Sequence, residues 1–157
     1  MYQEYKPLSK KPDVSTFVPY ELYEAQQQAF KKIDSQIASN WDAWVSQQLK
    51  LTQDDLWKNY SSEQIDSIGI CIYNFLKNKN FIIGDETGIG KGRILSGITR
   101  WALNSGKKVL FFTEREHLMT EFWKDLNDTE NIYLLKNPIS FHSNSKIYNP
   151  DGSIALR

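Results

Sequence analysis

A glycine-rich loop between an apolar run and a helical pattern constrains the fold of this chain more than any other feature. The segment 84–92 reads GDETGIGKG and directly follows the apolar run 81–83. Residues 93–104 then carry apolar side chains at helical spacing, and Gly106 is placed to end that helix. The order of strand, loop and helix predicts a loop whose backbone leads straight into a helix N-terminus.

The composition of this loop suits a phosphate group. Gly88 and Gly90 lack a Cβ, so the backbone can fold into a nest of amide hydrogens that bind phosphate oxygens. Lys91 supplies a positive charge for the β- and γ-phosphates, and the helix directs the positive end of its dipole at the same anion. We therefore predict a nucleotide site with Lys91 as the candidate catalytic residue. The candidate nucleotide ligands in the loop are Asp85, Glu86, Thr87, Gly88, Ile89, Gly90, Lys91, Gly92 and Arg93.

Two positions depart from the usual P-loop pattern. Asp85 stands where the first glycine is expected, and Gly92 replaces the Ser or Thr whose hydroxyl normally contacts Mg²⁺. Thr87 or a water molecule could complete the Mg²⁺ shell, and the sequence leaves that choice open. The alternative interpretation of the segment is an ordinary glycine-rich turn, but the flanking strand and helix patterns favour phosphate binding.

Strand and helix patterns alternate along the rest of the chain. Apolar runs at 108–113 and 132–135 predict two further buried strands, with an amphipathic helix over 116–126 between them. Upstream, helical patterns cover 20–37, 41–49, a short segment after Thr52, and the stretch from Ser61 or Ser62 to Leu76. We expect an α/β fold with a partial parallel sheet flanked by helices. The predicted domains are an extended arm (1–19), a helical appendage (20–60) and a nucleotide-binding domain (61–157) that is incomplete at its C-terminus.

Charge and cysteine content exclude several classes of protein. Lysine and arginine total 19, as do aspartate and glutamate, so any nucleic-acid-binding face must be local. The single cysteine, Cys71, excludes an intramolecular disulfide and suits a small buried thiol. Histidine and cysteine show no metal-site spacing, so no protein metal site is expected. No run approaches the ~18 apolar residues of a membrane span, so we expect a cytoplasmic protein without a membrane partner.

The string GDETGIGKGR (84–93) resembles motif I of superfamily-two helicases, and TGIGKGR is most similar to the strawberry notch type. The likeness is greatest to phage- and plasmid-encoded members, in which helicase and methyltransferase segments can share one polypeptide. The stretch FFTEREHLMTEFWKDL (111–126) looks like motif Ia of the same family. The stretch from YKPLSK to FVPYELYEA (5–25) resembles its N-terminal arm. The resemblance covers most of residues 5–127.

This resemblance implies the first RecA-like lobe of a helicase or translocase, preceded by a helical segment and using ATP and Mg²⁺. It implies nucleic acid as a partner, DNA rather than RNA. It also implies a second RecA-like lobe, either in the same longer polypeptide or in trans. A phage-encoded member would be found in the host cytoplasm or the virion.

The resemblance also implies three binding residues outside the loop. In such enzymes a glutamine upstream of motif I recognises adenine, and Gln64 stands 27 residues before Lys91. Ser61-x-x-Gln64 is also a helix capping box, and the two roles are not exclusive. Thr113 and Arg115 lie where motif Ia holds the sugar-phosphate backbone. The alternative for Thr113 is a cap at the start of a solvated helix.

Parts that hydrolysis needs are not recognisable in the sequence. An acidic strand motif that holds Mg²⁺ and arginine fingers from a second lobe are both missing, and the cluster Asp125, Asp128 and Glu130 fits a solvated helix face. The chain alone should therefore not unwind a duplex. It is either an N-terminal piece of a longer helicase, which its abrupt end favours, or a short non-catalytic nucleotide- or nucleic-acid-binding module, such as a phage antirestriction or inhibitory protein. A native species near 18.3 kDa would exclude the first interpretation.

Overall fold

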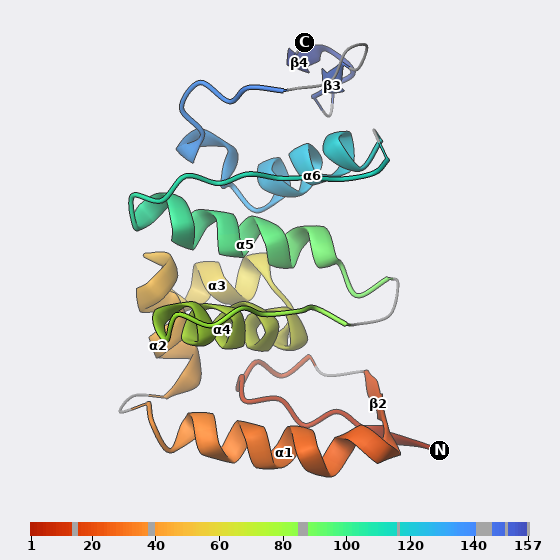
Figure 1. The fold of residues 1–157 in the computed structure, drawn as a ribbon, viewed down its shortest axis with the longest axis vertical. Helices are drawn as coiled ribbons and strands as arrows, with labels where there is room; N and C mark the ends of the chain where they lie inside the picture. Colours follow the sequence, from red (N-terminus) through yellow and green to blue (C-terminus); the bar gives the residue numbers. More distant parts are fainter. Residues whose placement is uncertain are drawn as a thin grey trace. The chain divides into compact units, whose positions relative to one another are not determined.

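The computed structural model describes residues 1–13, 16–37, 40–84, 88–115, 117–140, 146–149 and 151–156. The chain divides into two compact units, Met1–Ile83 and Gly84–Arg157, and each is described by itself. Helices make up most of the described residues, and both strand pairs found among them are antiparallel (Figure 1).

The first unit begins with a small hairpin and continues with helices (Figure 1). β1 (Tyr2–Glu4) pairs antiparallel with β2 (Phe17–Pro19), and α1 (Tyr20–Asp34) follows β2 directly. Next come α2 (Trp41–Leu49), α3 (Gln53–Asn59) and α4 (Ser62–Leu76). These last three helices begin at the predicted caps, because the side chains of Asn40, Thr52 and Ser61 each accept a hydrogen bond from the N–H three residues on. The helix predictions upstream of the loop are confirmed.

Apolar side chains of α2, α3 and α4 form the core of the first unit. Fully buried members are Val45, Leu49, Leu56, Ile65, Ile68 and Ile72. Gly69 allows α2 and α4 to approach closely, because a Cβ there would overlap the Trp41 indole. Cys71 is buried as expected, and burial raises the pKa of its thiol to about 12. Cys71 is therefore a structural residue and not a nucleophile.

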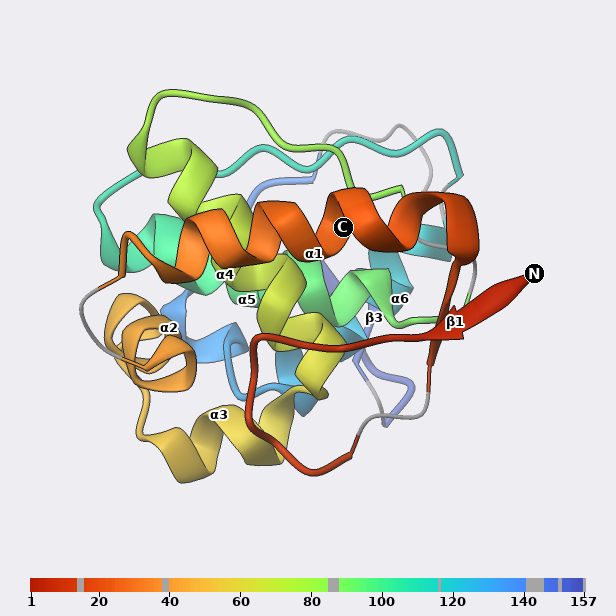
Figure 2. The same ribbon diagram turned by 90° about the horizontal axis from the view of Figure 1, so that it is seen from below.

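Two buried carboxylates anchor the segment between β1 and β2 to the helices. Asp66 of α4 accepts hydrogen bonds from the Tyr5 hydroxyl at 2.7 Å and from the backbone N–H groups of Leu8 and Ser9 at 2.8 and 3.0 Å. Asp42 of α2 accepts one from the backbone N–H of Lys10 at 2.8 Å. In Figure 2 this segment loops past α4 and α3 before it returns to β2. The N-terminal residues are therefore docked on the helices.

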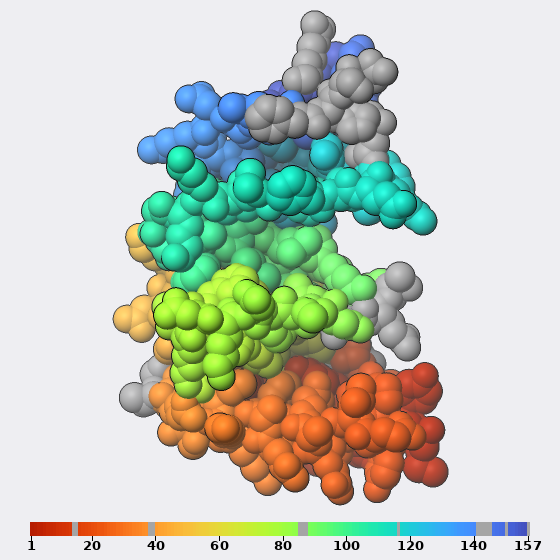
Figure 3. Space-filling view, in the orientation of Figure 1, coloured from red at the N-terminus to blue at the C-terminus, as the bar shows by residue number. Residues whose placement is uncertain are grey.

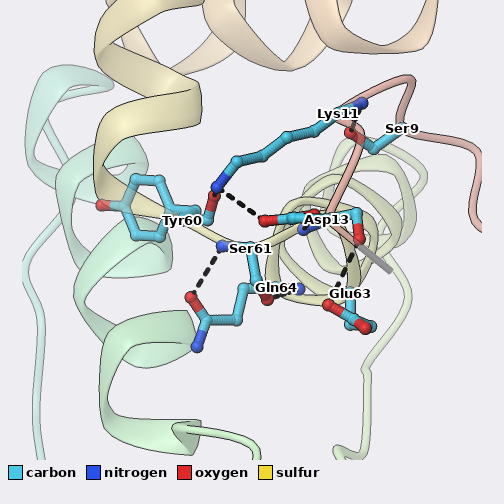
Figure 4. A network of polar contacts seen from close by, with 8 residues as sticks. Ser9, Lys11, Asp13, Tyr60, Ser61, Glu63 and Gln64 are labelled. Atoms are coloured by element: carbon cyan, nitrogen blue, oxygen red, sulfur yellow. Dashed lines mark hydrogen bonds and ion pairs between the residues drawn. The ribbon is translucent and has the colours of Figure 1, made fainter. Parts of the chain in front are cut away.

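The Lys11 side chain links the same segment to the end of α3. The Lys11 ammonium donates to the Tyr60 carbonyl at 2.9 Å and forms an ion pair with Asp13 at 2.7 Å (Figure 4). Asp13 also accepts a hydrogen bond from the backbone N–H of Ser62, the first residue of α4. Burial alone would raise the pKa of Asp13, but hydrogen bonds from Lys11 and Ser62 lower it overall.

The second unit is built on two adjacent helices, α5 (Lys91–Asn104) and α6 (His117–Asp128), which lie side by side (Figure 1). They are followed by the 3₁₀ helix η1 (Ile132–Leu134) and by a short antiparallel pair, β3 (Ile147–Tyr148) and β4 (Ile154–Leu156). Between α5 and α6, the segment 107–113 runs along the surface of this unit (Figure 3). Phe111 attaches it to α6 by stacking on Phe122, with ring centroids 4.5 Å apart.

A buried polar network fixes α5 against the end of α6. The Arg100 guanidinium donates to the Asn131 side-chain oxygen at 2.9 Å, and the Asn131 amide donates to the Ser96 hydroxyl at 2.9 Å. The hydroxyls of Ser96 and Thr129 are 2.6 Å apart. These four side chains are at most 6% exposed. Because buried polar groups are costly when a partner is lost, the network restricts how α5 and α6 can shift.

The predicted partial parallel sheet is not found among the described residues. The segments 81–84 and 107–113 are neither helix nor strand, and the predicted strand at 132–135 contains η1 instead. A parallel strand depends on hydrogen bonds to strands distant in sequence, and the described residues form no such ladder. The apolar side chains that a sheet would have buried are largely exposed: Ile82, Leu110 and Phe112. The coarse class, a mixture of helices and strands, is confirmed, while the predicted domain boundaries at 19 and 60 stay predictions.

Candidate nucleotide-binding site

The two central glycines of the loop have positive φ angles. Gly88 has a φ of 103°, and Gly90 has a φ of 80° with a ψ of 48°. Both values lie in the left-handed region, which costs a residue with a Cβ but costs glycine little. Asp85, Glu86 and Thr87 lie outside the described residues.

The helix that follows the loop begins at Lys91, two residues before the predicted start at residue 93. Gly90 is the N-cap of α5, and its carbonyl accepts hydrogen bonds from the N–H groups of Arg93 at 3.0 Å and Ile94 at 3.3 Å. Lys91 is therefore the first helical residue and is half-buried, as is Ile89 before it. The first N–H groups of a helix have no partner within that helix, so this end offers donors and the positive end of a dipole to an anion. These features fit a triphosphate.

At Gly92 the structure contains a feature that the sequence interpretation missed. A Cβ on Gly92 would overlap the Oδ2 oxygen of Asp125 and lie 2.9 Å from its carboxyl carbon. Asp125 belongs to α6 and its side chain is 27% exposed, so it is not part of a freely solvated helix face. Burial raises the pKa of Asp125, and the charges of Asp128 and Glu121 raise it further while Arg93 opposes them. The sequence feature that could have indicated this contact is Gly92 itself, because the P-loop pattern has a larger side chain at that position.

The Arg93 side chain forms ion pairs with two carboxylates of α6. Its Nε lies 3.9 Å from Asp125 Oδ1 and one terminal nitrogen lies 3.6 Å from Asp128 Oδ2. The Arg93 side chain is 38% exposed, so these ion pairs are partly screened by water. Its predicted role as a nucleotide ligand stays a prediction.

Gln64 lies in the first unit, at the N-terminus of α4, and completes the capping box. The Ser61 N–H donates to Gln64 Oε1 at 3.1 Å, and the Gln64 N–H donates to the Ser61 hydroxyl at 3.4 Å (Figure 4). The capping role is confirmed, and Gln64 is buried. Adenine recognition by the same side chain stays a prediction.

Thr113 and Arg115 form a small turn before α6. The Thr113 hydroxyl accepts a hydrogen bond from the Arg115 N–H at 3.3 Å. The Arg115 side chain is exposed, and its backbone carbonyl accepts from the Leu118 N–H at 3.1 Å. The turn uses only the main chain of Arg115, which leaves its guanidinium outside the turn. The predicted contacts with nucleic acid remain predictions.

The described ranges contain neither a cluster of metal ligands nor a membrane-spanning helix. Within the described ranges, no group of three or more histidine, cysteine, aspartate or glutamate side chains could hold a metal ion. A Mg²⁺ ion at this loop would therefore need phosphate and water oxygens in addition to protein ligands. None of the helices in the described ranges is long and apolar enough to span a bilayer.

Left-handed glycines, a lysine at the first helical position and a helix N-terminus directly after the loop are the features expected of a P-loop. The model of the family described as "P-loop containing NTP hydrolase pore-1" matches residues 20–152. The chain belongs to this family, which implies nucleotide binding and usually Mg²⁺. No curated protein and no solved structure gave a match to the chain.

Proposed function

We propose that this chain is the ATP-binding part of a superfamily-two helicase or translocase of the strawberry notch type. When complete with a second RecA-like lobe, such a protein would couple ATP hydrolysis to movement on nucleic acid, DNA rather than RNA. Membership of the P-loop NTP hydrolase family supports the nucleotide-binding part of this proposal. The string GDETGIGKGR supports the narrower assignment.

The observation that carries the proposal is the junction between the loop and α5. Left-handed Gly88 and Gly90 bring the backbone to the start of α5, where Lys91 is the first helical residue. No ion pair involves Lys91 within the described part of the chain, so its ammonium can bind the β- and γ-phosphates. Mg²⁺, when bound, would neutralise part of the phosphate charge. The backbone N–H groups at this helix end would hold the remaining phosphate oxygens.

Two further contacts belong to the same proposal. Gln64 would recognise the adenine through its amide while its Oε1 continues to cap α4. Thr113 and Arg115 would contact the sugar-phosphate backbone of the nucleic acid, the first through its hydroxyl and the second through its guanidinium.

Replacement of Lys91 by alanine tests the nucleotide site. Hydrogen bonds to charged groups contribute about 1.5–3 kcal/mol, so Lys91→Ala should lower ATP affinity about 10- to 100-fold. Isothermal titration calorimetry of the 157-residue chain with ATP measures this change. Because Lys91 is not in the core, the circular dichroism spectrum and the thermal midpoint should stay unchanged.

Lys124→Ala is the matched control, since Lys124 is an exposed lysine on α6. It removes the same charge from the same unit and should leave ATP affinity as it is. Equal ATP affinity in the wild type and in Lys91→Ala would contradict the proposed site. Equal losses in both variants would mean that overall charge, and not the loop, governs binding.

A further inference from the structure

The position that should carry a hydroxyl is filled by a carboxylate from another helix. In the P-loop pattern a Ser or Thr follows the lysine, and here that residue is Gly92. A Cβ on Gly92 would overlap Asp125 Oδ2, and it would lie 2.9 Å from Asp125 Cγ and 3.7 Å from Asp125 Cβ. A Ser or Thr at 92 therefore does not fit while Asp125 keeps this position. The Asp125 carboxylate therefore occupies the space in which a side chain at position 92 would begin.

We propose that Asp125 supplies the protein oxygen that contacts the Mg²⁺ of a bound nucleotide, in place of the hydroxyl missing at position 92. This inference rests on the proposed function, because Mg²⁺ is expected at the loop only together with a triphosphate. Mg²⁺ binds oxygen ligands, and in nucleotide sites it typically takes one or two carboxylates together with phosphate oxygens and water. A single carboxylate at the start of α5 meets that requirement.

The two oxygens of Asp125 have different surroundings. Oδ1 faces the Arg93 guanidinium, with Nε at 3.9 Å, whereas Oδ2 faces Gly92 in the first turn of α5. Arg93 also pairs with Asp128 at 3.6 Å, so its charge is shared between two carboxylates. The arginine thus holds the Asp125 side chain in place from one side while the other oxygen remains directed at the helix end.

Electrostatics makes a cation necessary if this carboxylate and a triphosphate occupy the same helix end. Both groups are negative, and the helix dipole attracts both to the first turn of α5. Without a cation they would repel, whereas a bound Mg²⁺ would accept oxygen ligands from both. Asp125 should therefore favour ATP binding when Mg²⁺ is present and should be neutral or unfavourable when it is absent.

Asp125→Asn tests this directly, because it keeps the shape of the side chain and removes its charge. ATP affinity is measured by calorimetry in excess Mg²⁺ and again in EDTA. Removal of outer-shell partners alone costs about 10- to 100-fold in metal affinity, so affinity in Mg²⁺ should fall at least about tenfold. In EDTA it should stay equal or rise. A similar loss in both conditions, or a gain in both, would overturn the inference.

A second readout uses Mn²⁺ as the probe. Mn²⁺ replaces Mg²⁺ at such sites and its electron paramagnetic resonance signal falls when it is bound. With ATP present, the wild-type chain should bind Mn²⁺ more tightly than ATP alone does, and Asp125→Asn should lose that gain. Equal Mn²⁺ binding by the two proteins would contradict the assignment.

Asp128→Asn is the matched control. Asp128 lies on the same helix and pairs with the same arginine, but its side chain is 54% exposed, and the three atoms nearest to a Cβ at position 92 all belong to Asp125. Its replacement should leave ATP affinity unchanged in Mg²⁺ and in EDTA. If Asp128→Asn behaved like Asp125→Asn, loss of the Arg93 ion pairs would explain both results.

An exchange of the two positions gives an independent test. Asp125→Ala vacates the space beside Gly92, and adding Gly92→Ser then places a hydroxyl there, as in the usual P-loop. The double variant should regain the Mg²⁺-dependent part of the ATP affinity that Asp125→Ala loses. Equal affinities of the single and double variants in Mg²⁺ would count against the inference.

Failure of this inference and failure of the proposed function give different results. If the wild type binds no ATP in either condition, the nucleotide site itself is wrong. If it binds ATP, and Lys91→Ala weakens binding while Asp125→Asn leaves it unchanged in Mg²⁺, only the role of Asp125 is wrong.

Discussion

The buried carboxylate of Asp66 should make the stability of the first unit fall as pH rises. Asp66 is fully buried on α4 and accepts hydrogen bonds from Tyr5, Leu8 and Ser9. Burial raises the pKa of this carboxyl from 3.8 to about 6, although the hydrogen bond from Tyr5 and those from the two backbone N–H groups oppose the shift. The folded state therefore binds the Asp66 proton more tightly than the unfolded state does.

The size of the effect follows from the pKa difference. Below the unfolded pKa of 3.8 the carboxyl is protonated in both states, so the stabilisation that arises from its raised pKa is fully present there. As pH rises through the folded pKa of about 6, the folded state must hold a buried charge and the term is lost. Each pKa unit corresponds to about 1.4 kcal/mol, so the full loss is about 3 kcal/mol, of which roughly 2 to 3 kcal/mol falls between pH 4 and pH 7.

Asp66→Asn isolates this term, because an amide does not titrate. The variant also loses one hydrogen-bond acceptor, but that cost of about 1–3 kcal/mol is independent of pH. Urea unfolding followed by tryptophan fluorescence, repeated from pH 4 to pH 7, gives the free energy of unfolding of both proteins. The wild-type value minus the variant value should fall by roughly 2 to 3 kcal/mol over this range.

A variant with the opposite sign serves as the control. Burial tends to raise the pKa of Asp13, but hydrogen bonds from Lys11 and Ser62 lower it overall, so its stabilising term is present above 3.8 and lost on acidification. The free energy of unfolding of the wild type minus that of Asp13→Asn should therefore rise with pH. The corresponding difference for Asp66→Asn should fall. A difference for Asp66→Asn that is constant or rises with pH would refute the reasoning.

Two further variants test the predicted ligand contacts. Gln64→Glu keeps the oxygen that accepts the Ser61 N–H and therefore keeps the cap of α4, while loss of the amide donor should narrow the difference between ATP and GTP affinity. An unchanged difference by calorimetry would leave Gln64 with its capping role alone. Arg115→Ala keeps the main-chain turn with Thr113 and should reduce the salt dependence of single-stranded DNA binding by a log–log slope of about 0.7. An unchanged slope in fluorescence anisotropy titrations would exclude a phosphate contact by Arg115.

The helices could be predicted because their signals are local. Asn40, Thr52 and Ser61 each stand before an apolar pattern, and each side chain accepts the hydrogen bond that a cap should accept. The helix predicted over 93–104 is α5, which begins two residues earlier, at Lys91 directly after the left-handed Gly90. Every partner in these interactions is at most four residues away, so a short stretch of sequence contains the whole interaction.

The strands could not be predicted for the opposite reason. The runs at 81–83 and 108–113 are apolar enough for a buried strand, but a strand forms only where a second strand supplies its hydrogen bonds. In the structure Phe111 packs on Phe122 of α6, while Leu110 and Phe112 remain largely exposed. The pairs that do form, β1 with β2 and β3 with β4, involve two or three residues each and carry no long alternating pattern.

Gly92, where the P-loop pattern has Ser or Thr, lies against the carboxylate of Asp125 on the neighbouring helix. The sequence shows both residues but not their contact. Helical spacing correctly places Asp125 on α6, but it cannot say which neighbour that face of the helix meets. Packing of α6 on α5 decides this, and the network of Ser96, Thr129 and Asn131 fixes how the helices lie. Given that packing, any side chain at 92 would collide with the Asp125 carboxylate. The Asp125 carboxylate can occupy this position only because residue 92 has no Cβ, so the effects of Gly92→Ser and of Asp125→Ala on ATP affinity should not add in the double variant.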